Sequence, residues 1–512
     1  MTGAAVLQPA RGRRAVSRVA RPLSKIHRWL GIVMGLFFAM WFASGMVMLF
    51  VPFPGLDPAQ RYRALLPIDV ASIRVAPADL AATYLGPTYL GSAAPGGLEL
   101  IQRATGPAWL LHPASGPIVA IDAATGAALP AVSPAAASAV ARRFVDAGTK
   151  AVLGPYDDDQ WIVHQNFNAY RPFYRVDLRD RAATRVYVSA RTGEILQATT
   201  RTQRIANWVG SVVHWIYPTI LRRYPTLWSY TVWAIALAGI ATGGAGFWLG
   251  WLRTLSALRH ARAAKLSPFR ALFKLHHLLG LTVGIFLLGW IVSGWLSVDH
   301  GLLFPTGAPD PRETASFRGV SLQQAARQVG RDALAGAGAG VSLSIDAVDG
   351  HAVLSLHRAD GGVRTTMLHG AIAMDGIPAA DLLRGARRAW PWSRPTLSPI
   401  AADDDYAHLL YDGLPDDAVR LRLGAGSGTW VDVSTSNGRI IDVVDWRRRL
   451  YRWLFNGLHT FDVPGLNRHP LLRELVMLPI LSTGLLLSLT GVTLGFKRLR
   501  RSVLRRPVRP AP

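Results

Sequence analysis

The chain of 512 residues contains no cysteine. This absence excludes iron–sulfur clusters, thiolate zinc sites, covalently attached c-type haem and disulfide bonds. Lys, Arg, Asp and Glu are also missing from the central portions of four long apolar runs, at 28–51, 228–251, 278–299 and 471–496. Each run has about the 20 residues that a helix needs to span a bilayer. With a mean hydropathy of +0.21, the chain is predicted to be a membrane protein with sizeable soluble parts.

Acidic residues are absent from three basic stretches, 11–28, 253–274 and 497–509, which together hold 20 Lys and Arg. These stretches precede the first run, separate the second from the third, and follow the fourth. An excess of Lys and Arg marks the cytoplasmic side of membrane proteins, so both termini and the middle loop are predicted to be cytoplasmic. The first run is too long for a signal peptide and is interpreted as an uncleaved anchor. The basic flanks suit lipid headgroups and argue against nucleic acid as a partner, despite a net charge of +24.

The chain matches itself in two places. KIHRWLG from Lys25 corresponds to KLHHLLG from Lys274, at an interval of 249 residues. Farther along, TRVYVSARTGEIL (184–196) corresponds to TWVDVSTSNGRII (429–441), at an interval of 245. We therefore predict an internally duplicated four-helix transmembrane bundle in which each half is a span, an outside domain and a span back. Functional sites of such proteins tend to lie where the repeats meet.

The outside segments are predicted to be two α+β domains, because each contains a hairpin pattern with a Thr-Gly or Asn-Gly turn and a stretch that reads as a helix, around 134–148 and from 321. The segments 204–227 and 447–470 read as helices at the membrane surface, ended by proline. The expected organisation is a tail and span at 1–51, an outside domain at 52–203, an interfacial helix and span at 204–252, a cytoplasmic loop and span at 253–300, a second outside domain at 301–446, and an interfacial helix, span and tail at 447–512.

Two pairs among the 14 histidines recur in register: His27 with His276, and His214 with His459. The first pair opens spans at the cytoplasmic side, and the second precedes spans on the outer side. A helix of 20 residues is about 30 Å long, so the two pairs cannot share one small ligand. Each neutral imidazole offers one lone pair, so two facing rings suit a haem iron with two axial ligands.

Glycines follow the two inner histidines at helical spacing. Gly31 and Gly35 lie one and two turns beyond His27, and Gly280 and Gly284 repeat this pattern. We expect them to open a slot for the porphyrin, with Gly45 and Gly294 on the same faces, five turns beyond His27 and His276. Ordinary helix packing explains small residues at this spacing as well.

Other ligands remain possible. His277 has no counterpart in the first half, so His276 is preferred, and His300 is a reserve candidate for the outer site. Zinc is the alternative metal, but it needs three or four converging ligands, and no HExxH or comparable spacing is present.

The outside segments carry two acidic triplets. Asp157–Asp159 precede His164, and Asp403–Asp405 precede His408. Such carboxylates could attract the cationic arm of a ferric complex or a freed ferrous ion, although a solvated loop or a helix start explains them equally. The stretch NAYRPFYRVDL (168–178) could hold an anionic or aromatic substrate, or form a cross-strand aromatic ladder.

The HRWLG opening, the TRVYV…TGEI element and the LH before the last span resemble the PepSY-associated transmembrane family, over nearly the whole chain. Its members include iron-regulated inner-membrane proteins and ferric-siderophore reductases with two b-type haems. The resemblance implies PepSY-like folds outside, a bacterial inner-membrane location, and two haem b groups. It also implies the axial ligands of these haems: His27, His214, His276 and His459.

The expected function is therefore that of a ferric-siderophore reductase, which passes electrons across the membrane to a periplasmic ferric chelate. The short cytoplasmic parts lack a Gly-rich dinucleotide or flavin motif, so the electrons are expected from a quinol or a separate reductase. Two alternatives stay open. The outside domains could bind periplasmic proteins or modulate peptidases, with the spans as anchors. The chain could also be a ferric-siderophore permease, for which the spans offer few polar groups.

Overall fold

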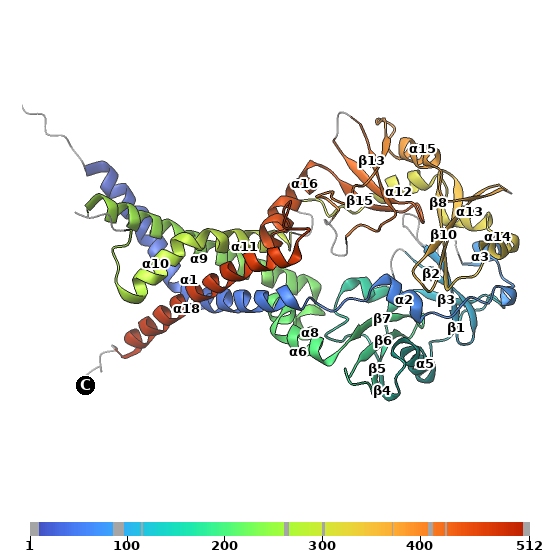
Figure 1. Cartoon of the computed structure of the whole chain (residues 1–512), viewed down its shortest axis with the longest axis horizontal. Helices are drawn as coiled ribbons and strands as arrows, with labels where there is room; N and C mark the ends of the chain where they lie inside the picture. Colours follow the sequence, from blue (N-terminus) through green and yellow to red (C-terminus); the bar gives the residue numbers. More distant parts are fainter. Residues whose placement is uncertain are drawn as a thin grey trace, which may run out of the picture. The chain divides into compact units, whose positions relative to one another are not determined.

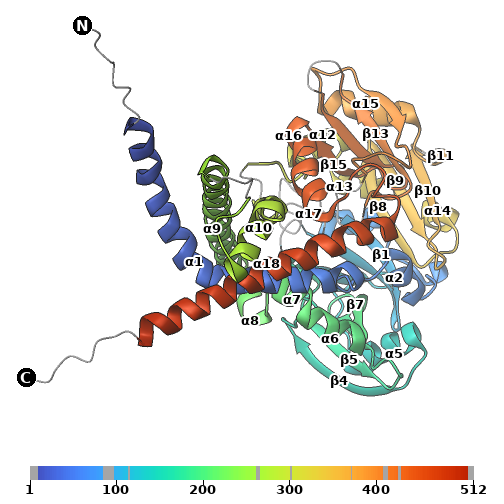
Figure 2. The same cartoon turned by 60° about the vertical axis from the view of Figure 1, so that its left-hand side comes forward.

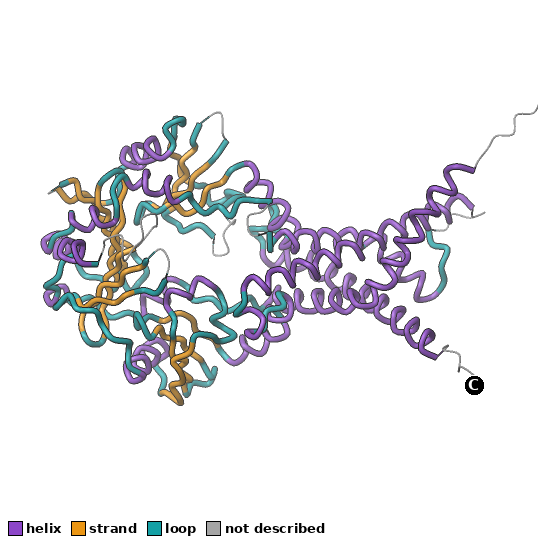
Figure 3. Tube along the Cα trace, turned by 180° about the vertical axis from the view of Figure 1, so that it is seen from behind, coloured by secondary structure: helices purple, strands orange, loops and turns teal. Residues whose placement is uncertain are grey.

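The computed structural model describes residues 10–84, 97–113, 116–260, 266–299, 303–370, 372–407, 413–424 and 428–504. The chain forms two compact units (Figure 1). The helical unit comprises Met1–Phe53, Ile205–His300 and Tyr451–Pro512, and the sheet unit comprises Pro54–Arg204 and Gly301–Leu450. Figure 3 shows the strands, in orange, in the sheet unit and long helices, in purple, in the helical unit.

Within the described residues, three helices are long and apolar enough to cross a membrane: α1 (Ala10–Phe50), α9 (Pro225–His260) and α18 (Pro470–Leu504). A fourth candidate span is the bent pair α10 (Ala271–Thr282) and α11 (Gly284–Leu296), whose axes differ by 57°. The chain is thus a multi-pass membrane protein with three to four candidate spans, and the third predicted span differs from the others in being broken.

The bend in the third span lies beside a hydroxyl that bonds back to its own helix, although Ser44 makes the same kind of bond within the unbroken α1. The hydroxyl of Thr282 donates back to the carbonyls of Leu278 and Leu279, at 3.0 and 3.4 Å. Such bonds compete with the helical ladder and often bend helices. The matched position in α1 is Val33, which has no hydroxyl, and α1 continues unbroken through it.

The spans pack through small and aromatic residues. Helix α1 lies against α18 and α9, α11 lies against α9, and α10 lies against α18, and Figure 2 shows α1 beside α18. A Cβ on Gly239 would lie 3.2 Å from Phe38, and one on Gly484 would overlap the ring of Phe42. These glycines therefore let the helices approach closely.

Short helices in series precede α9 and α18, where one interfacial helix was expected in each place. Pro225 and Pro470 begin the spans themselves, since proline fits the first helical turn. The first series is α6 (Arg201–Val209), α7 (Ser211–His214) and α8 (Thr219–Arg222), and the second is α16 (Trp446–Arg452), the π-helical turn η3 (Trp453–Gly457) and α17 (Leu458–Thr460).

The centre of the sheet unit is a seven-stranded antiparallel sheet in the order β11-β10-β9-β8-β1-β2-β3. Strand β1 pairs with β8, so the two outside segments share this sheet instead of forming two separate sheets. The strands are β1 (Gly97–Arg103), β2 (Gly106–His112), β3 (Val119–Asp122), β8 (Ser342–Val348), β9 (His351–His357), β10 (Val363–His369) and β11 (Ile372–Asp375). Helices α3 (Pro77–Thr83), α13 (Leu322–Arg327) and α14 (Arg331–Ala337) contribute to its core.

Two four-stranded antiparallel sheets complete this unit. One consists of β4 (Thr149–Tyr156), β5 (Phe173–Leu178), β6 (Arg185–Ser189) and β7 (Ile195–Thr199), with α2 (Pro58–Ala64) and α5 (Pro134–Val145) in its core. The other consists of β12 (Thr396–Pro399), β13 (Ala418–Arg422), β14 (Trp430–Ser434) and β15 (Ile440–Val444), with α12 (Pro311–Arg318) and α15 (Ala379–Ala389). Both expected hairpins are present, and their turns use Gly193 and Gly438 at positive φ, as glycine allows.

The same elements recur along the chain at one interval. Strand β8 begins 245 residues after β1, β13 begins 245 residues after β5, and α18 begins 245 residues after α9. This is the interval of the second set of sequence matches.

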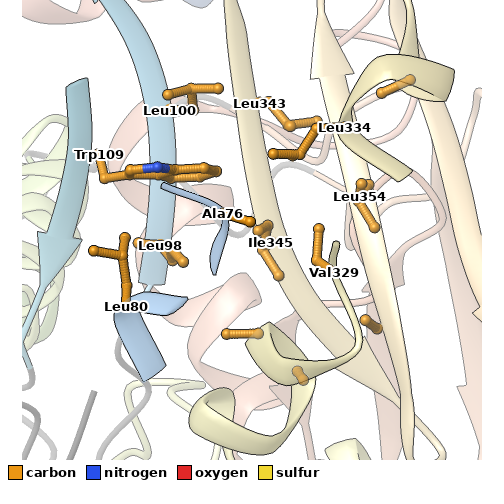
Figure 4. Packing of buried hydrophobic residues seen from close by; sticks show 14 of the residues in the cluster. Ala76, Leu80, Leu98, Leu100, Trp109, Val329, Leu334, Leu343, Ile345 and Leu354 are labelled. Carbon is orange, nitrogen blue, oxygen red and sulfur yellow. The ribbon is translucent and has the colours of Figure 1, made fainter. Parts of the chain in front are cut away.

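Trp109 anchors the core of the seven-stranded sheet. Its side chain is fully buried among Leu98, Leu100 and Leu80 (Figure 4), and its indole N–H donates to the carbonyl of Val75 at 2.9 Å.

Trp109→Ala is expected to lower the free energy of unfolding of the sheet unit by about 3–5 kcal/mol, because it leaves a large cavity. Denaturant unfolding of the full chain in detergent, followed by circular dichroism, measures this loss. Trp392→Ala is the matched control, since Trp392 is 63% exposed. Equal losses from both variants would contradict the assignment of Trp109 to the core.

Candidate functional site

The structure brings His27 and His276 together in the helical unit. His27 lies on α1 and His276 on α10, and their ring centres are 6.2 Å apart with planes inclined by 40°. These residues are 249 positions apart in the sequence, and they come together because α1 and α10 both pack against α18.

The structure also brings His214 and His459 together. His214 ends α7 and His459 lies in α17, and their ring centres are 6.4 Å apart with planes inclined by 78°. The indole N–H of Trp41 donates to the His214 carbonyl, and that of Trp290 donates to the His459 carbonyl, both at 2.9 Å. Matched tryptophans thus hold the backbone of each histidine.

Hydrogen bonds determine which nitrogen of the inner rings carries the proton. Nδ1 of His27 lies 3.1 Å from the carbonyl oxygen of Thr242, which can only accept, so Nδ1 donates. Nδ1 of His276 lies 2.9 Å from the hydroxyl of Thr490. That hydroxyl already donates to the carbonyl of Leu487 at 2.6 Å. Its remaining role toward His276 is to accept, so Nδ1 donates here too.

The outer rings follow the same rule through two serines. Nδ1 of His214 lies 3.0 Å from Ser44 Oγ, and Nδ1 of His459 lies 2.9 Å from Ser293 Oγ. Each hydroxyl donates to a carbonyl of its own helix, so it accepts from the ring. Burial lowers the pKa of His214 to about 3 and that of His459 to about 4, so both rings are neutral.

In all four rings, Nε2 is left with the lone pair, and within the described part of the chain no group makes a hydrogen bond with it. A metal-binding histidine typically donates its other N–H in this way, which fixes its tautomer and orientation. The separation within each pair also fits one shared metal ion. With a nitrogen–metal bond of about 2.0–2.1 Å and a ring centre about 1.1 Å behind the nitrogen, opposed ligands have centres about 6.3 Å apart.

A glycine lies against each ring. A Cβ on Gly246 would lie 2.5 Å from Cε1 of His27, and one on Gly294 would lie 3.2 Å from Cε1 of His459. In the same manner, a Cβ on Gly491 would lie 3.3 Å from Cε1 of His276, and one on Gly45 would lie 3.6 Å from Cε1 of His214. Sequence reasoning did not single out Gly246 or Gly491, although they recur at the 245-residue interval and could have been found by it.

The profile described as PepSY-associated TM region matches residues 24–498. The chain belongs to this family. The match includes all four paired histidines and both units. No curated protein matches the chain significantly.

The glycines expected to open a slot in this PepSY-associated protein differ in their surroundings. A Cβ on Gly35 would meet Val492 at 3.3 Å, and one on Gly284 would meet Phe247 at 3.6 Å, so both lie at helix contacts. Gly31 faces Thr242 at 3.8 Å, whereas no described atom lies within 4 Å of a Cβ on Gly280.

The other histidines singled out in the sequence lie elsewhere. His277 turns to α9, where its Nε2 bonds the Gly250 carbonyl at 3.0 Å, and His276 is the one that faces His27. His164 precedes the 3-10 helix η2 (Gln165–Tyr170). His300 and His408 lie outside the described residues.

The acidic triplets of this PepSY-associated protein are partly engaged in internal ion pairs. Asp159 accepts from the hydroxyl of Tyr187 at 2.8 Å and lies 3.6 Å from Arg175, and Asp404 pairs with Arg420 at 2.6 Å. These two carboxylates therefore pair with arginines on the strands.

In the 168–178 stretch, Phe173 is fully buried and Tyr174 nearly so, within β5. This result favours the cross-strand explanation over substrate binding for both rings.

Proposed function

We propose that this chain is an internally duplicated di-haem b-type cytochrome of the bacterial inner membrane that reduces periplasmic ferric siderophores. The observation that carries the proposal is the pairing of four imidazoles, with ring centres 6.2 and 6.4 Å apart and every Nδ1 already engaged. Family membership supports it. Haem b, when bound between two imidazoles, supplies one-electron transfer.

The chain's own residues account for the binding of such a group. His27 with His276 would hold the inner haem, and His214 with His459 the outer one. The Thr242 carbonyl and the hydroxyls of Thr490 and the two serines keep each imidazole neutral and fix the orientation of its ring. Four glycines leave room for the rings, and no cysteine is required, because b-type haem is not covalently attached.

The basic flanks of the spans support an orientation with both termini in the cytoplasm and the sheet unit in the periplasm. The chain would accept electrons from a quinol in the bilayer or from a separate reductase. It would deliver one electron to the ferric ion of the chelate, which becomes ferrous and is held less tightly by hard oxygen ligands.

We expect the chain purified in detergent to contain about two haems per polypeptide and to give a b-type difference spectrum when dithionite-reduced protein is compared with oxidised protein. Addition of a ferric siderophore to the reduced protein is then expected to return the spectrum to the oxidised form.

The gallium complex of the same siderophore is the control, because gallium has the charge and size of ferric iron but accepts no electron under these conditions. A colourless preparation from haem-replete cells would refute the cytochrome. Persistence of the reduced spectrum in the presence of the ferric complex would refute the acceptor.

A further inference from the structure

Three potential metal ligands meet in the sheet unit, in residues that the proposed cytochrome does not use. His351 begins β9, His369 ends β10, and Asp381 lies in the first turn of α15. Their ligand atoms all lie within 4.8 Å of one another.

Strand register brings the two histidines together. Strands β9 and β10 are antiparallel and pair Val353 with Met367, and the same register continued by two residues sets His351 opposite His369. Their rings are stacked, with centres 3.9 Å apart and planes inclined by 17°. Cross-strand neighbours point to the same face of a sheet, so both rings lie on one face, and one ring must turn out of the stack for both lone pairs to reach one ion.

His369 and Asp381 lie in contact but do not form a hydrogen bond. Nε2 of His369 is buried and has no hydrogen-bond partner among the described residues, and it lies 3.6 Å from Oδ1 of Asp381. This distance is too long for an N–H···O hydrogen bond. Two atoms bound to one ion at about 2.1 Å in tetrahedral geometry lie about 3.4 Å apart, which is close to the separation observed.

Asp381 has a second partner. Its Oδ1 accepts from the guanidinium of Arg384, which also bonds Asp349 at 2.6 Å and is half exposed. A carboxylate in the first helical turn is favoured by the helix dipole, which explains Asp381 but not the two stacked imidazoles that face it.

We propose that His351, His369 and Asp381 bind one divalent transition-metal ion. Two imidazoles and one carboxylate are typical ligands of Zn²⁺ and of Fe²⁺, and three protein ligands leave positions for water or an exchangeable ligand. Ca²⁺ and Mg²⁺ prefer oxygen ligands. At the 245-residue interval, the matching residues of the first half are Gly106, Ala124 and Ala136, so the site belongs to the second half alone.

Equilibrium dialysis of the full chain in detergent against Zn²⁺, followed by elemental analysis, tests the site. We expect one Zn²⁺ per chain in the wild type. Loss of a supporting residue around a metal typically costs about 10–100-fold in affinity, so His369→Ala, which removes a ligand, is expected to cost at least about 100-fold. His469→Ala is the matched control, because His469 is exposed and belongs to the helical unit, whereas the cluster belongs to the sheet unit.

Two further variants distinguish a metal site from a cluster that only stabilises the fold, and from the haem sites. Arg384→Ala is expected to raise the Zn²⁺ affinity about fivefold, because it removes a competing cation from Asp381; a purely structural cluster would not respond in this way. His276→Ala is expected to leave Zn²⁺ binding unchanged, so failure of the cytochrome proposal would not affect this result.

Absence of one-to-one Zn²⁺ binding by the wild type would overturn the proposal without any variant. Equal affinities of the wild type and His369→Ala would do the same. If His369→Ala fails to fold by circular dichroism, Asp381→Asn replaces it, since this change keeps the shape of the side chain and removes its charge.

Discussion

Purified His276→Ala protein is expected to contain one haem instead of two. If the proposed function holds, the variant would leave His27 as the only histidine able to hold the inner haem, and a site that loses one of two imidazoles would bind the group much less tightly. The haem-to-protein ratio should fall from about two to about one, and His459→Ala should give the same ratio by losing the other haem.

The two losses are expected to be independent because the sites are far apart on one helix. His27 and Ser44, which bonds His214, are both on α1. Seventeen residues of helix correspond to about 25 Å. The difference spectra of the two variants should therefore add up to that of the wild type.

His277→Ala is the matched control for this experiment. His277 is the neighbour of His276 on the same helix, but its ring bonds the Gly250 carbonyl and does not face His27. This variant should keep both haems. Loss of both haems from His276→Ala, in protein that folds as the wild type does, would contradict two separate sites.

The pairing of the four histidines could be predicted because they recur in register. Their hydrogen-bond partners could not, since Ser44 and His214 are 170 residues apart and meet only after α1 and α7 pack. The same limit applies to the cluster of His351, His369 and Asp381. Only the register of β9 and β10 brings its histidines together, and no spacing in the sequence marks it.

The division of the outside segments into two domains was a reasonable expectation from the repeat, but β1 and β8 pair directly. An edge strand leaves unpaired backbone groups that another strand can satisfy. The sequences of β1 and β8 do not indicate which strand each one pairs with. The bend of the third span could not be predicted either, because Thr242 makes the same back-bond as Thr282 within an unbroken helix.

Gly246→Ala is expected to weaken haem binding at the inner site without changing a ligand. The new Cβ would lie 2.5 Å from Cε1 and 2.6 Å from Nδ1 of His27, which is closer than nonbonded atoms can approach. The ring would have to move, and this would disturb the hydrogen bond between Nδ1 and the Thr242 carbonyl on the same helix α9. Loss of such supporting contacts typically costs about 10–100-fold in affinity.

Gly244→Ala is the matched control, since it lies two residues away in α9 and no described atom lies within 4 Å of its Cβ position. Haem titration of both variants should show a weakened inner site only in Gly246→Ala, with the outer site unchanged. The inner haem is recognised by the part of the spectrum that His276→Ala lacks. If Gly246→Ala bound both haems as tightly as Gly244→Ala, the orientation of the His27 ring would not depend on the glycine behind it. The inner site would then tolerate a displaced imidazole.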